Sequence, residues 1–374
     1  MTHGCVWALL CLFLVSCSGS LQQKAATPYE EDIALLKTRL KADPSDLKTV
    51  QQLGILFYRA GQYKNAITTL GKAHDRDPQD PLSLAYLGLS LEENGSIADA
   101  IGMYGRFQDL SEAGEYYYWL KGRQLLAQKR LDHLQLARDL LAFDGLATPV
   151  WQEGRVAIAA LTYYGEDSRY AGLGLVLAEM LTRRMGEVGI PNLIPVEKIS
   201  LYNSLAELPP FSENLDPSAK TLGQFFAAPI VLTGGYNIID GNVVADFTVW
   251  DVRSSEEPRR VTRLGSLTEL EKILRRMGGA LVEKIPEAGK IRNGEWTDFQ
   301  PLNWSQIADY SRGVYHQNRG EYLAAVEAFR AAVKAGEGGL PSKERLERAR
   351  LLAISVQDPI KLYALPNLAK QATR

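Results

Sequence analysis

Glycines recur 34 residues apart in the first half of the chain, at positions 54, 88 and 122. A fixed period of this length constrains the fold strongly, because each copy must form the same small unit and stack on its neighbours. Gly61 follows the first of these glycines by seven residues and would permit a turn. Apolar positions before the turn fall on one face of a helix. The spacing therefore predicts stacked pairs of antiparallel helices over residues 30–147.

The residues around these glycines resemble the tetratricopeptide repeat. Those on the consensus spacing of that repeat in the first copy are Leu53, Gly54, Gly61, Gln62, Tyr63, Ala66, Leu70, Ala73 and Pro78. The second copy keeps Gly88, Gly95, Ala100 and Tyr104, whereas the third departs from the pattern at Lys129. The resemblance implies an α-solenoid that presents a surface to other proteins.

A further copy is expected near the end of the chain. The residues that reproduce the spacing there are Gly313, Gly320, Tyr322, Ala325, Phe329 and Ala332. An amphipathic helix over residues 343–356 would follow and cap the apolar end of the repeats. Residues 302–374 are therefore expected to form a C-terminal helical unit of the same type, preceded by a linker at 289–301.

The pattern between the two repeat regions, over residues 150–288, is that of a mixed sheet with packed helices. Short apolar runs beginning at Val156 and Ile230 have strand length, and an amphipathic helix is expected from Leu173. Asp240-Gly241 separates two alternating runs and predicts a tight β-hairpin, since such a turn needs positive φ at both positions. Further segments are expected as a strand at 193–194, a helix at 197–208, a strand at 260–264 and a helix opened by a capping box at 266–269.

This central segment resembles the amino-terminal domain of TolB-type proteins and the related curli-secretion (CsgG-like) lipoproteins. The residues that carry the resemblance are the strand at Val156, Leu173–Leu181, the hairpin entry Val231–Gly234, and Trp250-Asp251-Val252. The resemblance implies a periplasmic recognition or assembly module without catalysis.

The amino terminus has the features of a secretory signal. Residues 6–15 form an apolar run that is too short to span a bilayer and has the length of a signal-peptide core. Leu14-Val15-Ser16-Cys17 resembles the bacterial lipobox, although Met1–Cys5 contains no Lys or Arg. The resemblance implies removal of residues 1–16, lipidation of Cys17, and a tether at 17–29. Ser18 after the cysteine implies sorting to the outer membrane, facing the periplasm.

Charge and motif content argue against several other classes of protein. Lys and Arg number 42 against 44 Asp and Glu, so there is no basic excess for nucleic acid. His74, His133 and His316 lie far apart, so no metal site is expected. Gly172-Leu173-Gly174 lacks the third glycine of a dinucleotide loop, and no nucleophile elbow is present. We therefore expect no cofactor, no catalytic residues and no enzymatic activity.

The strongest binding hypothesis places a partner on the first helices of the repeats. The positions that line this groove in the resembled family are Lys48, Gln51, Tyr58, Arg59, Leu82, Leu89, Glu92 and Glu93. Filling of the groove by the chain's own α/β domain is the alternative. The aromatic run 116–119 could also form a recognition patch, but on a helix it points in all directions, so about two members are expected in the core.

The sequence as a whole predicts a multidomain α plus α/β protein, with an α-solenoid, a central mixed β-sheet and a C-terminal helical repeat. Its expected function is that of a lipid-anchored periplasmic scaffold that binds protein partners of a cell-envelope complex. Two alternatives remain open at this point: a CsgG-like subunit of an outer-membrane secretion pore, and an undetected envelope hydrolase. The pore would need lipid-facing strands of about 9–11 residues, and Asp246 and Asp251 lie on opposite faces of the candidate strand.

Overall fold

The structure is a computed structural model. It describes residues 27–110, 114–145, 149–187, 189–209, 211, 218–283, 285, 303–336 and 340–360. The expected signal peptide, Cys17 and the whole expected linker lie outside the described residues, as does most of the expected tether. The chain forms two units, one made of Met1–Leu131 with Ile354–Arg374 and the other of Asp132–Ala353. We call these unit 1 and unit 2.

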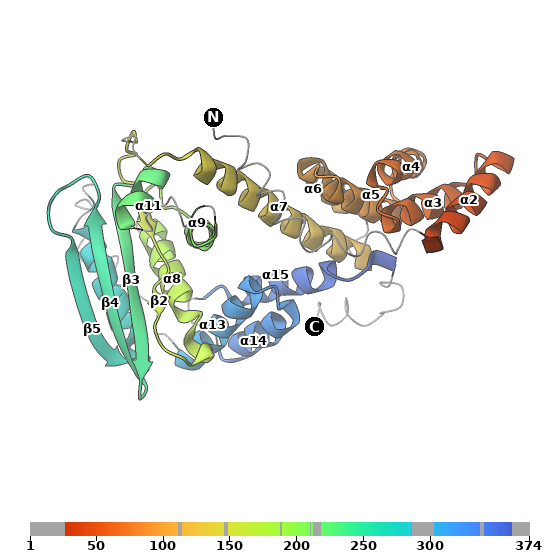
Figure 1. Ribbon diagram of the computed structural model, residues 1–374. Coiled ribbons are helices and arrows are strands. Elements are labelled where there is room, and N and C mark those ends of the chain that lie inside the picture. The colour runs from red at the N-terminus through yellow and green to blue at the C-terminus, as the bar shows by residue number, and fades with distance from the viewer. Residues whose placement is uncertain are drawn as a thin grey trace. The chain divides into compact units, whose positions relative to one another are not determined.

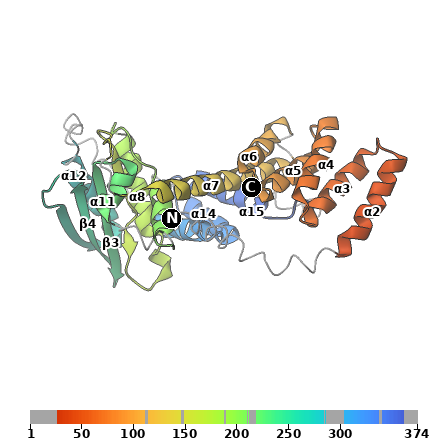
Figure 2. The same ribbon diagram turned by 45° about the horizontal axis from the view of Figure 1, so that its top comes forward.

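Unit 1 is built from helices that follow one another in a stack (Figures 1 and 2). Its elements are α2 (Thr27–Ala42), α3 (Leu47–Arg59), α4 (Tyr63–Arg76), α5 (Pro81–Glu93), α6 (Ile97–Gly105), η1 (Arg106–Asp109) and the first part of α7 (Glu115–Ala142). Asp46 and Asp80 cap α3 and α5 by accepting backbone N–H groups of the first turn. The turns inside the two pairs use Gly61 and Gly95, at φ +70° and +86°. These pairs, α3–α4 and α5–α6, confirm the predicted helical repeats.

The repeated glycines of the first helices are sites of close helix contact. A Cβ on Gly54 would lie 2.5 Å from Cγ of Leu70, and one on Gly88 would lie 2.2 Å from the Tyr104 ring. Because interiors are close-packed, any larger side chain would push the paired helices apart. The 34-residue period therefore has a packing cause.

The third copy differs from the prediction of a helix pair. Residues 115–142 form the single helix α7, with Gly122 in its interior. Lys129 stands where Gly61 and Gly95 make the turns of the earlier copies. Lysine disfavours a positive φ and favours helix, so nothing ends the helix at that point. A helix also begins at Thr27, inside the segment expected to be tether.

Unit 2 contains a mixed five-stranded sheet in the order β1-β3-β4-β5, with β2 also paired to β3. The strands are β1 (Val156–Ile158), β2 (Thr162–Tyr163), β3 (Ile230–Ile239), β4 (Asn242–Asp251) and β5 (Arg259–Ser266). β1 and β2 run parallel to β3, whereas β3, β4 and β5 are antiparallel. The hairpin between β3 and β4 turns at Asp240 and Gly241, both at positive φ, as predicted. The expected strand at 193–194 is reduced to a single bridge between Leu193 and Val156.

Helices pack on both faces of this sheet. They are α8 (Leu173–Glu187), α9 (Val196–Ala206), α11 (Ala219–Phe226) and α12 (Leu270–Val282), with short 3-10 turns η2 (Ser168–Tyr170) and η3 (Leu267–Glu269). One face of β4, including Val243 and Phe247, is buried with residues of α8 and α12. The other sheet face packs with α9, α11 and the end of α7. The sequence analysis had assigned no element to residues 219–226, where α11 lies.

The C-terminal helices form the expected further copy of the repeat. α13 (Trp304–Asn318) and α14 (Tyr322–Lys334) pair as a hairpin and are followed by α15 (Ser342–Ser355). Gly313 again faces an aromatic ring, 2.5 Å from Phe329 for an added Cβ, and Gly320 makes the turn at φ +77°. Side chains of α13 and α14 belong to the same hydrophobic core as α8 and the sheet. The α/β segment and these helices therefore share one core.

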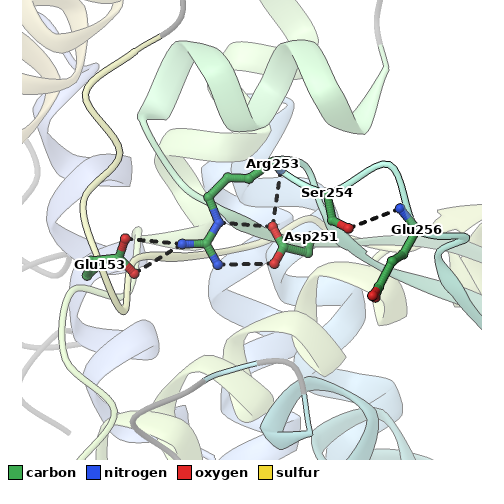
Figure 3. Close-up of polar contacts among 5 residues, drawn as sticks. All are labelled: Glu153, Asp251, Arg253, Ser254 and Glu256. Carbon is green, nitrogen blue, oxygen red and sulfur yellow. Dashed lines mark hydrogen bonds and ion pairs between the residues drawn. The ribbon is translucent and has the colours of Figure 1, made fainter.

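The Trp250-Asp251-Val252 motif fastens the end of β4. Trp250 Nε1 donates to Thr233 Oγ1 at 3.0 Å, and the Val252 N–H donates to the Pro229 carbonyl. Asp251 accepts two hydrogen bonds from the Arg253 guanidinium, which also reaches Glu153 at 3.1 Å (Figure 3). The motif is thus explained by strand termination and loop anchoring within unit 2.

Candidate functional site

The predicted groove residues lie on α3 and α5 of unit 1, but they differ in exposure. Lys48, Arg59 and Glu93 are exposed, Gln51, Tyr58 and Leu82 are half-buried, and Leu89 and Glu92 are buried. Gln51 donates to the Asp80 carboxylate that caps α5, so it links the first two repeats. The exposed and half-buried residues remain candidates for contact with a partner.

Glu92 has a different role from the one expected of it. Only 2% of its surface is exposed. Its carboxylate accepts hydrogen bonds from Arg123 on α7, at 2.8 and 3.0 Å, and from the Tyr104 hydroxyl at 2.6 Å. Burial, followed by the negative charge of Glu92, raises the pKa of Tyr104, so the hydroxyl stays protonated and donates. Glu92 therefore joins α5, α6 and α7 inside the unit and does not face a partner.

Four side chains from three helices of unit 1 converge on residues 357–360 of the same unit. We call these side chains the turn-binding site: Arg59 of α3, Tyr86 of α5, and Tyr116 and Trp119 of α7. The Tyr86 hydroxyl donates to Asp358 Oδ1 at 2.7 Å, and an Arg59 terminal nitrogen lies 3.5 Å from Asp358 Oδ2. Trp119 Nε1 donates to the Gln357 carbonyl at 2.9 Å. The Tyr116 hydroxyl donates to the Pro359 carbonyl, also at 2.9 Å.

Aromatic packing fixes the donors of this site in place. Tyr86 and Trp119 are almost fully buried, and their rings pack edge-on against Tyr58 and Tyr104. Burial and then the hydrogen bond to Asp358 raise the pKa of Tyr86, so its hydroxyl is a donor across the physiological range. Burial and the nearby Glu93 raise the pKa of Tyr58 to about 12. The site thus offers rigid neutral donors and one cation, which suits a polypeptide with a carboxylate.

The sequence pointed to only part of this site. Arg59 and its neighbour Tyr58 were among the predicted groove residues, whereas Tyr86, Tyr116 and Trp119 were not. The aromatic run 116–119 was the available signal, and two of its members, Tyr116 and Trp119, are buried as expected. In the described residues the segment seated there comes from the C-terminal part of the chain. The alternative of filling by the α/β domain stays a prediction.

Unit 2 contains a pocket of about 370 Å³ between α8, α9 and the start of α15. Arg345 lines this pocket and contacts Glu179, Glu197 at 3.1 Å, and the Tyr310 hydroxyl at 3.2 Å. Burial raises the pKa of the Glu179 carboxyl, and the positive charge of Arg345 opposes that rise. Three arginines and three glutamates line the pocket, so their formal charges balance.

The described residues contain no group of three or more His, Cys, Asp or Glu side chains placed to hold a metal ion. His74 Nε2 lies 3.2 Å from Arg106 in unit 1, and His316 Nδ1 lies 2.7 Å from Glu321 in unit 2. Within the same described part of the chain, no helix is long and apolar enough to cross a membrane.

Comparisons with known proteins give limited matches. No family model matches the chain. A segment of 65 residues, 17% of this chain, is 35% identical to the photosystem I assembly protein Ycf3 of Synechococcus sp. (strain CC9902) and spans 38% of that protein's length. A solved structure, a tetratricopeptide repeat protein from Parabacteroides merdae, aligns over 85% of this chain and 90% of its own, with 14% identity and a TM-score of 0.24. The helix pairs α3–α4, α5–α6 and α13–α14 themselves identify the repeats.

Proposed function

We propose that the chain is a lipid-anchored scaffold of the bacterial cell envelope, whose unit 1 holds a segment of a protein partner. Repeats of paired helices in this class mediate protein–protein interaction and assembly. The matched stretch of an assembly protein supports such a role. Attachment through Cys17 and a periplasmic outer-membrane location complete the proposal.

One observation carries the binding role. Side chains of α3, α5 and α7 direct two hydroxyls, an indole N–H and a guanidinium onto a turn of polypeptide. Helix surfaces that serve only as packing faces bury apolar groups, whereas this one binds main-chain carbonyls and a carboxylate. Such a set of donors on a rigid scaffold is what recognition of a peptide segment requires.

The binding role can be tested by site-specific photocrosslinking in intact envelopes. A photoreactive residue is placed at Lys48 or Glu93, which are exposed on the first helices, and at Lys72 on α4 as a matched exposed control. We expect a discrete cross-linked protein from Lys48 and Glu93 that weakens when Arg59→Ala is added. Equal products from Lys72, or products unaffected by Arg59→Ala, would contradict binding at this face.

The anchor is tested separately by Cys17→Ser. We expect this variant to lose the mass of the attached lipid, because serine has no thiol to carry it. Without the acyl chains that stable anchoring needs, the protein should leave the membrane fraction. Cys11→Ser is the matched control, since that residue precedes the expected cleavage point. An unchanged mass and membrane pool for Cys17→Ser would reject the lipoprotein. Conductance of liposomes exposed to the purified protein would argue for the pore.

A further inference from the structure

Residues 357–360 form a turn that is held in unit 1. The side chain of Asp358 closes this turn by a hydrogen bond within it. Asp358 Oδ1 accepts the Ile360 N–H at 3.1 Å, and Pro359 is buried. The same carboxylate faces outward from the turn to the Tyr86 hydroxyl and the Arg59 guanidinium. The occupant of the turn-binding site is therefore an Asp-Pro turn.

The contacts separate into general and selective ones. Trp119 and Tyr116 bind main-chain carbonyls on either side of Asp358, and every polypeptide supplies such carbonyls. Selectivity comes from the carboxylate, held between a hydroxyl and a guanidinium, and from proline, whose fixed φ favours the turn. A segment without the carboxylate would leave the Tyr86 hydroxyl buried and without its acceptor.

We propose that the turn-binding site recognises Asp-Pro turns of partner proteins, and that Asp358-Pro359 is an internal occupant which a partner displaces. This inference rests on the proposed function, because it names the class of segment that unit 1 binds. A partner carrying an Asp-Pro turn would replace each hydrogen bond of the internal turn with an equivalent one.

The ion pair between Arg59 and Asp358 is the contact of the turn-binding site that is open to solvent. The Arg59 and Asp358 side chains keep 34% and 36% of their surface exposed, so water screens this pair and weakens it. The Trp119 and Tyr116 donors are buried, so the site favours some occupant over none. An internal ligand acts at a high effective concentration and therefore lowers the apparent affinity for an external one.

The test measures binding of a fluorescent, end-blocked peptide, Ser-Val-Gln-Asp-Pro-Ile, to the full chain by anisotropy. We expect Asp358→Ala to bind this peptide at least about fivefold more tightly than the wild type, because the internal competitor is weakened. Adding Tyr86→Phe and Arg59→Ala should remove that gain, while Arg39→Ala, an exposed arginine of α2, should leave it intact. A peptide with Asn in place of Asp should bind at least about fivefold more weakly.

A second measurement keeps the inference testable if a variant is unstable. In the wild-type chain, excess peptide should speed hydrogen exchange of the chain's own residues 357–360 and leave exchange in α8 unchanged. Equal binding of the Asp and Asn peptides, or no binding to Asp358→Ala together with unchanged exchange, would overturn the inference. If Asp358→Ala dimerised without peptide, the site would be binding a second copy of this chain. That result would overturn the assignment of a separate partner protein.

The outcomes also separate this inference from the proposed function. Persistent, Arg59-dependent cross-links from Lys48 with no peptide binding would overturn the Asp-Pro specificity alone. Peptide binding with no cross-linked envelope protein would leave the chemistry of the site standing and overturn the scaffold role.

Discussion

Glu92 Oε1 lies 2.8 Å from Nε of Arg123, and this pair connects the second repeat to α7. The two residues are 31 positions apart, and their side chains keep 3% and 19% of their surface exposed. Arg130 adds a second cation, 3.7 Å from the same carboxylate. The third copy is the single helix α7 and has no second helix to pack against it. The charged contact with Glu92 helps to join α7 to the stack.

Removing one partner of this pair should destabilise unit 1. Glu92→Ala leaves the mostly buried Arg123 without its acceptor, and breaking a buried pair in this way costs about 3–5 kcal/mol. The measurement is hydrogen exchange of α5 amides, which reports the opening of unit 1 separately from unit 2. Glu93→Ala is the matched control and should change the free energy of unfolding of unit 1 by less than about 0.5 kcal/mol. Equal effects of both changes would contradict the structural role of Glu92.

The repeated glycines predict a pair of opposite effects within one hairpin. Gly88→Ala places a Cβ 2.2 Å from the buried Tyr104 ring and should destabilise unit 1 by about 1–3 kcal/mol. Gly102→Ala, on the exposed side of α6, meets nothing within 4 Å and should stabilise by about 0.4–1 kcal/mol. Chemical denaturation of each variant provides the comparison. The packing explanation of the period fails if the two substitutions have the same sign.

Local rules made the helix pairs and the hairpin predictable. Gly54, Gly88 and Gly313 each pack against a residue 16 positions later. The need for glycine at these positions can therefore be recognised within the sequence of one repeat. Asp240-Gly241 is likewise a local signal, because positive φ at both positions is a property of the turn.

What the sequence did not reveal depends on distant partners. Glu92 looked like an exposed groove residue, and only the position of Arg123 in the next copy makes it internal. Tyr86 meets Asp358 across 272 positions, so no period or motif could bring them together. The single helix α7 reflects a weak negative signal, the absence of a glycine at 129.

The cap of α3 predicts a pH dependence. Hydrogen bonds from the Thr49 hydroxyl and then the Thr49 N–H lower the pKa of Asp46 below its ordinary 3.8. Its stabilising effect is therefore present above pH 3.8 and is lost as the pH falls through the lower, folded-state value. Asp46→Asn caps equally well without a titrating group. We expect the two proteins to match in stability at neutral pH and the wild type to fall behind in acid; a constant difference across pH would contradict this.

The Arg345–Glu179 pair of unit 2 predicts a dependence of stability on pH that is opposite in sign to that of the Asp46 cap. Their side chains keep 12% and 16% of their surface exposed, so Arg345→Ala leaves a mostly buried carboxylate without its cation and should cost about 3–5 kcal/mol at neutral pH. Burial already raises the pKa of Glu179 above 4.5, and loss of Arg345 raises it further. A raised folded-state pKa favours the protonated carboxyl, so the defect should be small below pH 4.5 and grow as the pH rises through the folded-state value.

Hydrogen exchange of α8 amides between pH 4 and 7 measures this change, because α8 carries Glu179. Arg348→Ala, an exposed arginine that lines the same pocket, serves as the control and should show no such trend. If the Arg345→Ala defect were equal at both ends of the range, the lost contribution would be the packing of the arginine stem and the Tyr310 contact. Glu179→Gln in the Arg345→Ala background separates these two causes, since it should restore stability at neutral pH only if the unpaired charge is responsible.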